Sequence, residues 1–243
     1  MTKTLISIII WLIAGIFFLF GALIYTIALL LFPPYKLHGL AKIISRIIML
    51  SGGQWFKVKG QVPNKKNGPY LYLINHASLF DAFMIIGGVN HYCTGVGAKF
   101  QFSYPVWGFL AKRYGVIPIE RGKIKSAIGS LSKLELAIKN GTSTMIAPEG
   151  TRTLNGKLGK FKKGAFHVAK NTGVTIIPVA LIGAYNAKKV TDWRIKPGSL
   201  ITIFGEPISK NAYANLNVED LSSLVKTKIA ELLGNEDLTK DSL

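Results

Sequence analysis

The chain has 243 residues, and its 30 Lys and Arg against 12 Asp and Glu give a formal net charge of +18. Hydrophobic residues make up 49% of it and the mean hydropathy is +0.32, an apolar content that excludes intrinsic disorder. A single cysteine, Cys93, excludes an intrachain disulfide framework and a thiolate zinc cluster. Strong positive charge combined with positive hydropathy indicates an anionic membrane surface as a partner, rather than nucleic acid.

The charge is unevenly spread along the chain. No Asp or Glu precedes Asp81, and seven of the twelve acidic residues lie from Glu206 onward. The first third of the chain therefore carries positive charge only. The few carboxylates between Asp81 and Glu149 stand in a basic region, which makes them candidates for specific roles.

An uncharged apolar run extends from Leu5 to Phe32. As a helix it would be about 42 Å long, enough to cross a hydrocarbon core of ~30 Å with some tilt. A secretory signal is the alternative, but the run exceeds the usual ~7–15 apolar residues and no small-x-small cleavage site follows it. Lys and Arg are denser after the run than before it, so the positive-inside rule predicts that the rest of the chain lies in the cytoplasm.

Pro33 and Pro34 end this helix, and the periodicity predicts a second one from Tyr35 to Leu50. Its apolar face alternates with Lys36, Lys42 and Arg46, which is typical of a helix lying in the headgroup layer. The alternative is a core helix with a charged outer face. The sequence also leaves open whether the first helix spans the bilayer or dips into one leaflet.

From residue 53 onward, short apolar runs alternate with helical patterns, which predicts an α/β domain. The predicted strands are 56–58, 70–74, 91–96, 115–119, 143–147, 174–181 and 199–204, and the predicted helices are 79–89, 104–113, 123–139, 161–170 and 218–233. The expected fold is a mixed sheet of about seven strands flanked by helices, preceded by an N-terminal membrane-embedded helical segment. We therefore divide the chain into a membrane-attachment segment (1–52), an α/β domain (53–234) and a polar tail (235–243).

The first polar cluster, Asn75-His76-Ala77-Ser78-Leu79-Phe80-Asp81, follows an apolar strand, where ligand sites form in α/β sheets. His76 is expected on the loop and Asp81 one turn into the next helix. Such a carboxylate can hold the imidazole in one tautomer and stabilise its protonated form, as a general base acting on a hydroxyl requires. In the alternative, Ser78 caps the helix and Asp81 is only a favourable charge near its N-terminus.

The second cluster ends the apolar strand 115–119 with Glu120 and Arg121. Arginine suits a bidentate grip on phosphate, and the alternative is a surface ion pair between these two residues. His91 and His167 are expected to be structural, and Cys93 to be a buried thiol.

The third cluster, Pro148-Glu149-Gly150-Thr151-Arg152-Thr153, again follows a strand. It precedes a basic segment in which a helix beginning near Phe161 would direct backbone N–H groups toward an anion. The alternative for Lys160 and Lys162 is a solvated face. No P-loop, G-x-S-x-G or H-E-x-x-H pattern occurs, which argues against a P-loop nucleotide site, a serine hydrolase and a zinc protease.

Taken together, four blocks resemble those of the glycerolipid acyltransferases, and most closely the bacterial 1-acyl-sn-glycerol-3-phosphate type. The blocks, each after a strand and in the family's order, are Asn75-His76-x4-Asp81, Gly115-x5-Arg121, Pro148-Glu149-Gly150-Thr151-Arg152 and Ile177-Pro178-Val179. The resemblance covers roughly residues 56–207, and the apolar N-terminal segment suits that family's membrane attachment. Two positions depart from its pattern, Glu120 where many members have Asp and Phe100 where a Glu often follows the lysine.

The resemblance implies direct acyl transfer without metal or cofactor. His76, oriented by Asp81, would deprotonate the sn-2 hydroxyl of 1-acyl-sn-glycerol 3-phosphate, which would attack the thioester of acyl-CoA or acyl carrier protein and give phosphatidic acid. The substrate-binding residues that it implies are Arg121, which would hold the acceptor phosphate, Glu149, Gly150, Thr151 and Arg152, which would shape the same pocket, and Lys99 as a further phosphate ligand.

The implied partners are membrane phospholipids, the lysophospholipid acceptor and the acyl donor, with no nucleic acid. The implied location is the bacterial inner membrane, with the catalytic domain on the cytoplasmic side. One alternative is acylation of a lyso-ornithine lipid, a glycolipid precursor or glycerol 3-phosphate. Another is a non-enzymatic basic protein that binds membranes or RNA, although aromatic stripes are lacking among the basic clusters. That alternative predicts that replacing His76 changes nothing measurable.

Overall fold

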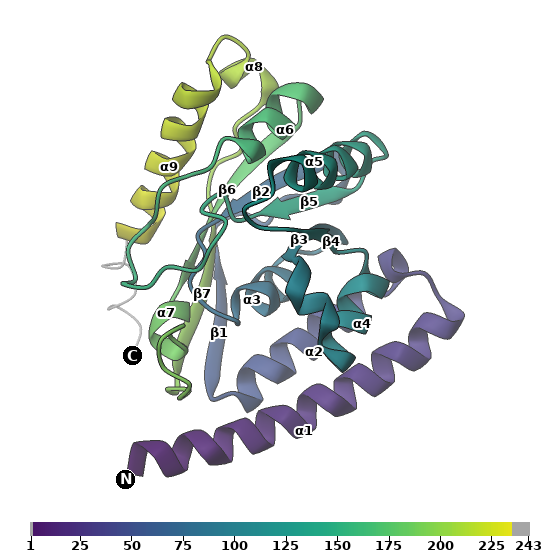
Figure 1. The fold of residues 1–243 in the computed structure, drawn as a ribbon, viewed down its shortest axis with the longest axis vertical. Coiled ribbons are helices and arrows are strands. Elements are labelled where there is room, and N and C mark those ends of the chain that lie inside the picture. The colour runs from purple at the N-terminus through teal and green to yellow at the C-terminus, as the bar shows by residue number, and fades with distance from the viewer. Residues whose placement is uncertain (1, 235–243) are drawn as a thin grey trace.

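The computed structural model describes residues 2–234, and the polar tail predicted at 235–243 lies outside the described residues. Seven strands form a sheet in the order β1-β7-β6-β2-β5-β3-β4 (Figure 1). Their bounds are β1 Gln54–Lys59, β2 Tyr70–Ile74, β3 Cys93–Ala98, β4 Ile117–Ile119, β5 Ser143–Ile146, β6 Thr175–Ile182 and β7 Gly198–Phe204. Strands β6, β2, β5, β3 and β4 are parallel, whereas β7 is antiparallel to β6 and pairs in parallel with β1. The predicted mixed seven-stranded sheet is therefore confirmed.

The helices of the described residues follow the predicted order, with two short additions, α7 and α8. Their bounds are α1 Thr2–Leu31, α2 His38–Ser51, α3 Asp81–Gly88, α4 Pro105–Tyr114, α5 Ile124–Lys139, α6 Gly164–Thr172, α7 Ala184–Ala187, α8 Lys210–Tyr213 and α9 Val218–Gly234. The prediction that a helix begins near Phe161 is wrong by three residues. The N–H of Lys162 donates to the carbonyl of Pro148 (2.8 Å), which holds this stretch in the preceding loop.

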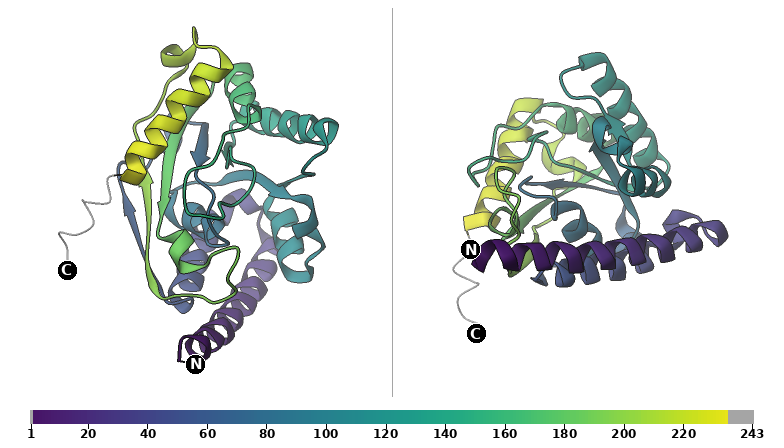
Figure 2. Two further views of the ribbon diagram at one scale, coloured as in Figure 1. Left: turned by 60° about the vertical axis from the view of Figure 1, so that its left-hand side comes forward. Right: turned by 60° about the horizontal axis from the view of Figure 1, so that its bottom comes forward.

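Helices cover both faces of the sheet (Figure 2). The central strand β2 is buried along its whole length, as expected for a parallel strand covered on both sides. Its side chains alternate between two cores: Tyr72 belongs to the one that includes residues of α2 and α3, and Leu73 to the one formed with α5, α6 and α9. The loops that follow the carboxyl ends of the parallel strands carry the site described below.

Helix α1 lies along the base of the molecule and is attached to it over most of its length (Figures 1 and 2). Near its start, the Ser7 hydroxyl donates to the carbonyl of Ile195 (2.9 Å). Near its end, the ring of Tyr25 lies 6.4 Å from that of Tyr114, between centroids. Among the described helices it is the one that is long and apolar enough to cross a membrane. The contacts at both ends fix its direction along the domain surface.

Helix α2 has one face in the core and one face outside. Met49 is fully buried in the core on the α3 side of the sheet, whereas Ile43 and Leu50 are about 60% exposed. Lys42 donates to the side chain of Asn90, and Arg46 donates to the carbonyl of Gly87 (2.9 Å). These two cations therefore lie at the C-terminal end of α3, where positive charge is favourable. The inner face of α2 is therefore part of the protein core, as in the alternative of a core helix. The exposed apolar residues of the outer face are suited to contact with a membrane.

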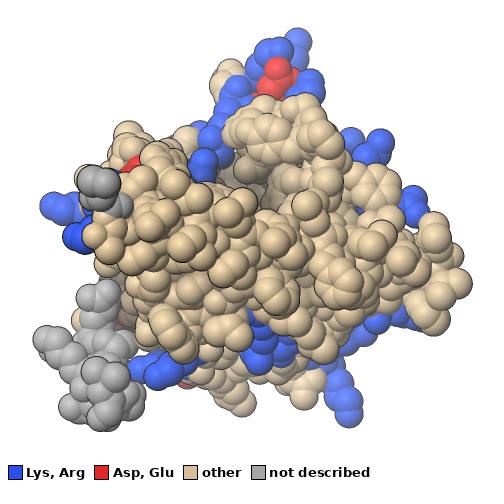
Figure 3. All heavy atoms as spheres, turned by 90° about the horizontal axis from the view of Figure 1, so that it is seen from below, with Lys and Arg blue, Asp and Glu red and all other residues tan. Residues whose placement is uncertain are grey.

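The surface around α1 and α2 is mostly apolar. Seen from below, it is a broad face on which Lys and Arg lie mainly at the margins and acidic residues are scarce (Figure 3). The most exposed of the large apolar residues of α1 are Leu12, Ile16, Phe20, Leu30 and Leu31. A contiguous apolar patch of this extent, bordered by cations, is typical of a membrane-contact surface.

Candidate active site

His76 and Asp81 meet at the carboxyl end of β2. The Nδ1 atom of His76 lies 2.6 Å from the Oδ2 atom of Asp81. The carboxylate is buried, with 3% of its side chain exposed, whereas 24% of the His76 side chain is exposed. Since Nδ1 donates to the carboxylate, Nε2 is the ring nitrogen that can accept a proton from a substrate. The pair thus has the arrangement that a general base requires.

The backbone before α3 holds the Asp81 carboxylate in place. Its Oδ2 atom also accepts the N–H groups of Ala77 (2.8 Å) and Ser78 (3.0 Å). The prediction that Asp81 lies one turn into the helix is wrong, because residues 78–80 form a turn and Asp81 is the first residue of α3. Ser78 is not a cap either, since its hydroxyl donates to the carbonyl of Lys188 (2.9 Å). This short loop lets one carboxylate oxygen serve the imidazole and two backbone donors.

Asn75 anchors the His76 loop to the neighbouring strand β6. Its buried side chain accepts the N–H of Leu181 (2.7 Å) and donates to the carbonyl of the same residue (3.1 Å). The paired amide contacts fix the point at which the chain leaves β2. The sequence marked Asn75 only as part of a motif, because its partner lies 106 positions away along the chain.

Glu149 connects the two loops of the site rather than facing outward. Its Oε1 atom accepts the backbone N–H of His76 and its Oε2 atom that of Gly159, both at 2.8 Å. The residue is 7% exposed, and burial raises the pKa of its carboxyl while these two hydrogen bonds partly oppose the rise. A Cβ at position 159 would lie 2.7 Å from Oε2, so a larger residue there would displace the Glu149 carboxylate. Glu149 therefore sets the distance between the His76 loop and the segment 150–163.

The segment after Glu149 folds back over the site. Gly150 has a φ of +70°, which favours glycine, and a Cβ there would lie 2.9 Å from the ammonium of Lys162. The N–H of Thr153 donates to the carbonyl of His76 (2.8 Å). Thr151 is exposed on this segment, and its part in substrate binding stays a prediction.

Three cations, Arg121, Arg152 and Lys188, lie near one another. Burial lowers the pKa of Arg121 and, together with the charge of Arg152, leaves it below its usual range. The pKa of Lys188 is lowered in the same way, first by burial and then by Arg152. Within residues 2–234, neither arginine forms an ion pair with a carboxylate. Cations that repel one another in this way favour the binding of an anion.

Lys188 was not predicted from the sequence. It follows α7 in a loop that carries no recognisable motif, and its carbonyl reaches Ser78 only through the fold. The available signal was a pair of lysines, 188 and 189, shortly after a buried strand.

Glu120 pairs with Lys99 (3.2 Å) and Lys123 (2.7 Å), not with Arg121. Hydrogen bonds from these lysines lower the pKa of its carboxyl. The surface pair of Arg121 with Glu120 is therefore excluded, and Arg121 is left to other partners. The role of Lys99 as a phosphate ligand stays a prediction, since its side chain is exposed and engaged by Glu120.

Other titratable groups lie in the core. The Nε2 atom of His91 lies within hydrogen-bonding distance of the Tyr72 hydroxyl (3.2 Å) and the Ser143 hydroxyl (3.0 Å). Burial lowers the pKa of His91 to about 4, so it is neutral at physiological pH. Cys93 is fully buried, as expected, and burial raises its pKa to about 12.

Residues 56–182 match the model of the Acyltransferase family. A 1-acyl-sn-glycerol-3-phosphate acyltransferase of Haemophilus influenzae is 31% identical over 214 residues, covering 85% of this chain and 86% of that protein. A chloroplastic protein of the same name from Arabidopsis thaliana is 29% identical over 217 residues, or 83% of this chain and 56% of that protein. The matches to four plant relatives span 33% to 65% of their lengths.

The structure also superposes on a solved one. The crystal structure of a 1-acyl-sn-glycerophosphate acyltransferase from Thermotoga maritima matches with a TM-score of 0.78 at 20% identity, covering 96% of this chain and 97% of that one. This likeness includes the N-terminal helices as well as the sheet, and it shows that the two proteins share a fold. The family model covers more than half of the chain and contains His76, Asp81, Arg121, Glu149 and Arg152. The chain belongs to the Acyltransferase family.

Proposed function

We propose that the protein transfers an acyl chain from a thioester, acyl-CoA or acyl carrier protein, to the sn-2 hydroxyl of 1-acyl-sn-glycerol 3-phosphate, giving phosphatidic acid. The observation that carries this proposal is the 2.6 Å contact between His76 and Asp81, together with Arg121 and Arg152, which interact with each other and form no ion pair with a carboxylate in residues 2–234. A base together with a group of cations suits an acceptor that has a hydroxyl and a phosphate. The relatives' names support the same acceptor.

The acceptor hydroxyl would lie against Nε2 of His76. As its oxygen attacks the thioester carbonyl, the hydroxyl proton passes to Nε2, and the imidazolium that forms is stabilised by the Asp81 carboxylate through Nδ1. The attack gives a tetrahedral intermediate. When this collapses, the carbon–sulfur bond breaks, and the leaving thiolate takes the proton from Nε2. The products are the ester and the free thiol. The reaction is complete without an acyl-enzyme or a metal, because the proton taken from the hydroxyl is returned to the thiolate.

Arg121 and Arg152 would hold the acceptor phosphate, with Lys188 as a third cation. Arg121 follows β4, and Arg152 lies on the segment that Glu149 connects to the His76 loop. The phosphate and the base are therefore supported by the same hydrogen-bonded frame. A planar guanidinium can bind a phosphomonoester through two hydrogen bonds, which fixes the direction of the glycerol as well as its position.

The protein would lie on the cytoplasmic leaflet with α1 in the membrane plane. Because Ser7 and Tyr25, at opposite ends of α1, both contact the α/β domain, a spanning α1 would draw polar surface of that domain into the hydrocarbon. An in-plane helix buries its exposed apolar side without this cost. This placement brings the site to a substrate that is itself confined to the leaflet, while a soluble thioester donor approaches from the cytoplasm.

A transfer assay with the purified full-length protein tests the proposal. Radiolabelled acyl-CoA or acyl carrier protein is offered with 1-acyl-sn-glycerol 3-phosphate, a lyso-ornithine lipid or glycerol 3-phosphate. The first acceptor should be used, and His76→Ala should reduce its rate by ~10²–10⁴-fold. His167→Ala, which alters an exposed histidine on α6, is the matched control and should be normal. Near-normal turnover by His76→Ala, or preference for an acceptor without phosphate, would reject the assignment.

A further inference from the structure

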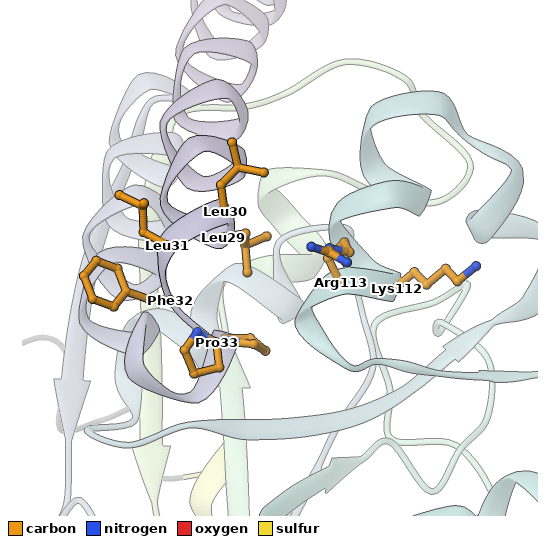
Figure 4. Close-up of a pocket in the computed structure, with 8 residues that line it drawn as sticks. Leu29, Leu30, Leu31, Phe32, Pro33, Lys112 and Arg113 are labelled. Carbon is orange, nitrogen blue, oxygen red and sulfur yellow. The ribbon is translucent and has the colours of Figure 1, made fainter.

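A second concave site lies between the end of α1 and the end of α4, away from His76. It has a volume of about 540 Å³ and is lined by Leu29, Leu30, Leu31, Phe32, Pro33, Pro34, Lys112 and Arg113 (Figure 4). One wall is the last turn of α1 with the proline turn that follows, and the other is the last turn of α4. We call this cavity the α1–α4 pocket.

The α1 wall of the pocket is apolar and open to the membrane face. The exposed fractions of Leu30, Leu31 and Phe32 are 77%, 72% and 50%. They continue the exposed apolar side of α1, which we place in the hydrocarbon. A molecule held in this pocket therefore has an alkyl surface on one side and direct access to the lipid tails.

The α4 wall is cationic. Figure 4 shows the guanidinium of Arg113 directed toward the α1 residues, while the ammonium of Lys112 points away from them. In residues 2–234, neither side chain forms an ion pair with a carboxylate. The sequence also has no Asp or Glu in 1–80 or 82–119, so α1, α2 and α4 supply no acid to compete. An anion at this position meets uncompensated positive charge.

We propose that the α1–α4 pocket binds one anionic glycerophospholipid of the surrounding bilayer, of the phosphatidylglycerol class. Its phosphodiester would lie against the Arg113 guanidinium, with Lys112 as a second cation on the outer side of α4, and the upper part of an acyl chain would follow Leu30 and Phe32. The volume is in the range of small-ligand sites and fits a headgroup with its first methylenes, while the rest of the chains stays in the bilayer. The lipid joins α1 to α4 and fixes this corner of the protein at an anionic surface.

The pocket is distinct from the proposed acceptor site. Arg113 lies in the last turn of α4, before β4, whereas Arg121 follows β4. The lining of the pocket includes none of the proposed catalytic or acceptor-binding residues. The bound lipid is a structural ligand and not a substrate in transit.

Native mass spectrometry of the full-length protein in an uncharged detergent tests this inference. Phosphatidylglycerol, phosphatidylcholine and phosphatidic acid with identical acyl chains are added in turn, and retained lipid is counted. Wild type should retain one phosphatidylglycerol and bind it at least roughly tenfold more tightly than phosphatidylcholine, since two surface cations each attract an anionic headgroup. In the double variant Arg113→Ala with Lys112→Ala, the affinities for phosphatidylglycerol and phosphatidylcholine should become nearly equal. Arg113→Lys should keep most of the preference for phosphatidylglycerol.

The matched control is Lys133→Ala with Lys139→Ala, which removes two exposed lysines from α5. It should retain the preference. Equal binding of phosphatidylglycerol and phosphatidylcholine by wild type overturns the proposal, as does an equal loss in the control, which would indicate diffuse attraction. Tight retention of phosphatidic acid alone also overturns it, since that would mark a product site. The measurement needs no turnover, so His76→Ala protein should behave as wild type even if the proposed reaction is wrong.

Discussion

Replacing Asp81 with Asn tests the catalytic pair with the smallest change in shape. In the protein, Oδ2 of Asp81 accepts from His76, Ala77 and Ser78, whereas Oδ1 is buried without a hydrogen-bond partner in the described part of the chain. An asparagine can place its oxygen at the Oδ2 position and its amide at the Oδ1 position. The loop geometry is then kept, and the charge that stabilises the imidazolium is lost.

The expected magnitude follows from that lost charge. A hydrogen bond to a charged group contributes roughly 1.5–3 kcal/mol, so kcat should fall roughly 10- to 150-fold with little change in either KM. His76→Ala should lose more, ~10²–10⁴-fold, because the base itself is removed. Since Asp81 acts through His76, the double variant should be no slower than His76→Ala alone. Such non-additivity is the expected signature of two residues that act as a unit.

Steady-state kinetics of the four proteins on mixed micelles provides the measurement. Asp220→Asn, at an exposed position in the first turn of α9, is the matched control and should keep full activity. Circular dichroism of each variant shows whether the fold is kept. Additive losses in the double variant, or a raised acceptor KM with unchanged kcat in Asp81→Asn, would show that Asp81 does not act through His76.

Three further substitutions test the proposed phosphate-binding cations, the hydrogen bonds between the two loops of the site, and a buried histidine of the core. Arg121→Ala should raise the acceptor KM and lower kcat/KM by ~10²-fold, and Arg121→Lys by less; an unchanged acceptor KM would move the phosphate to Arg152. Glu149→Gln should lower stability by about 1–3 kcal/mol, because an amide can accept only one of the two N–H groups that the carboxylate accepts; an unchanged Tm would contradict this. His91 has a pKa lowered by burial from 6.5 to about 4, so wild type should lose up to roughly 3 kcal/mol as pH falls through that interval, since the unfolded chain takes up the proton first. His91→Gln cannot titrate and should show a flatter dependence of Tm on pH between 7 and 4.5; equal slopes would show that His91 is not the group responsible.

The sheet could be predicted because its strands are local apolar runs. Strands such as β2 and β6 are buried on both faces, so they appear in the sequence as continuous hydrophobic segments ended by turns. Strand order and the antiparallel placement of β7 depend on contacts between distant segments, which no local pattern contains. The packing of the inner face of α2 against the core could not be predicted either, because an amphipathic helix has the same periodicity whether a core or a lipid layer covers it.

The site was predictable where chemistry is local and not where it depends on the fold. His76 and Asp81 are five residues apart, and their spacing alone suggested a pair. Glu149 could be chosen from its motif, but its bonds to His76 and Gly159 form between loops and not within a pattern. Lys188 has no motif, and it joins the cations only because α7 ends beside the His76 loop.

The same Lys188 loop shows how membrane attachment and catalysis belong to one unit. At one end, the carbonyl of Lys188 holds Ser78, a donor to the catalytic carboxylate through its backbone. At the other end, the carbonyls of Trp193 and Ile195 accept hydrogen bonds from Trp11 and Ser7 of α1. The eight residues 188–195 therefore connect the helix that we place in the leaflet to the loop that orients His76. Because the substrate is itself held in the leaflet, fixing α1 relative to this loop also fixes the depth at which the base meets the acceptor hydroxyl.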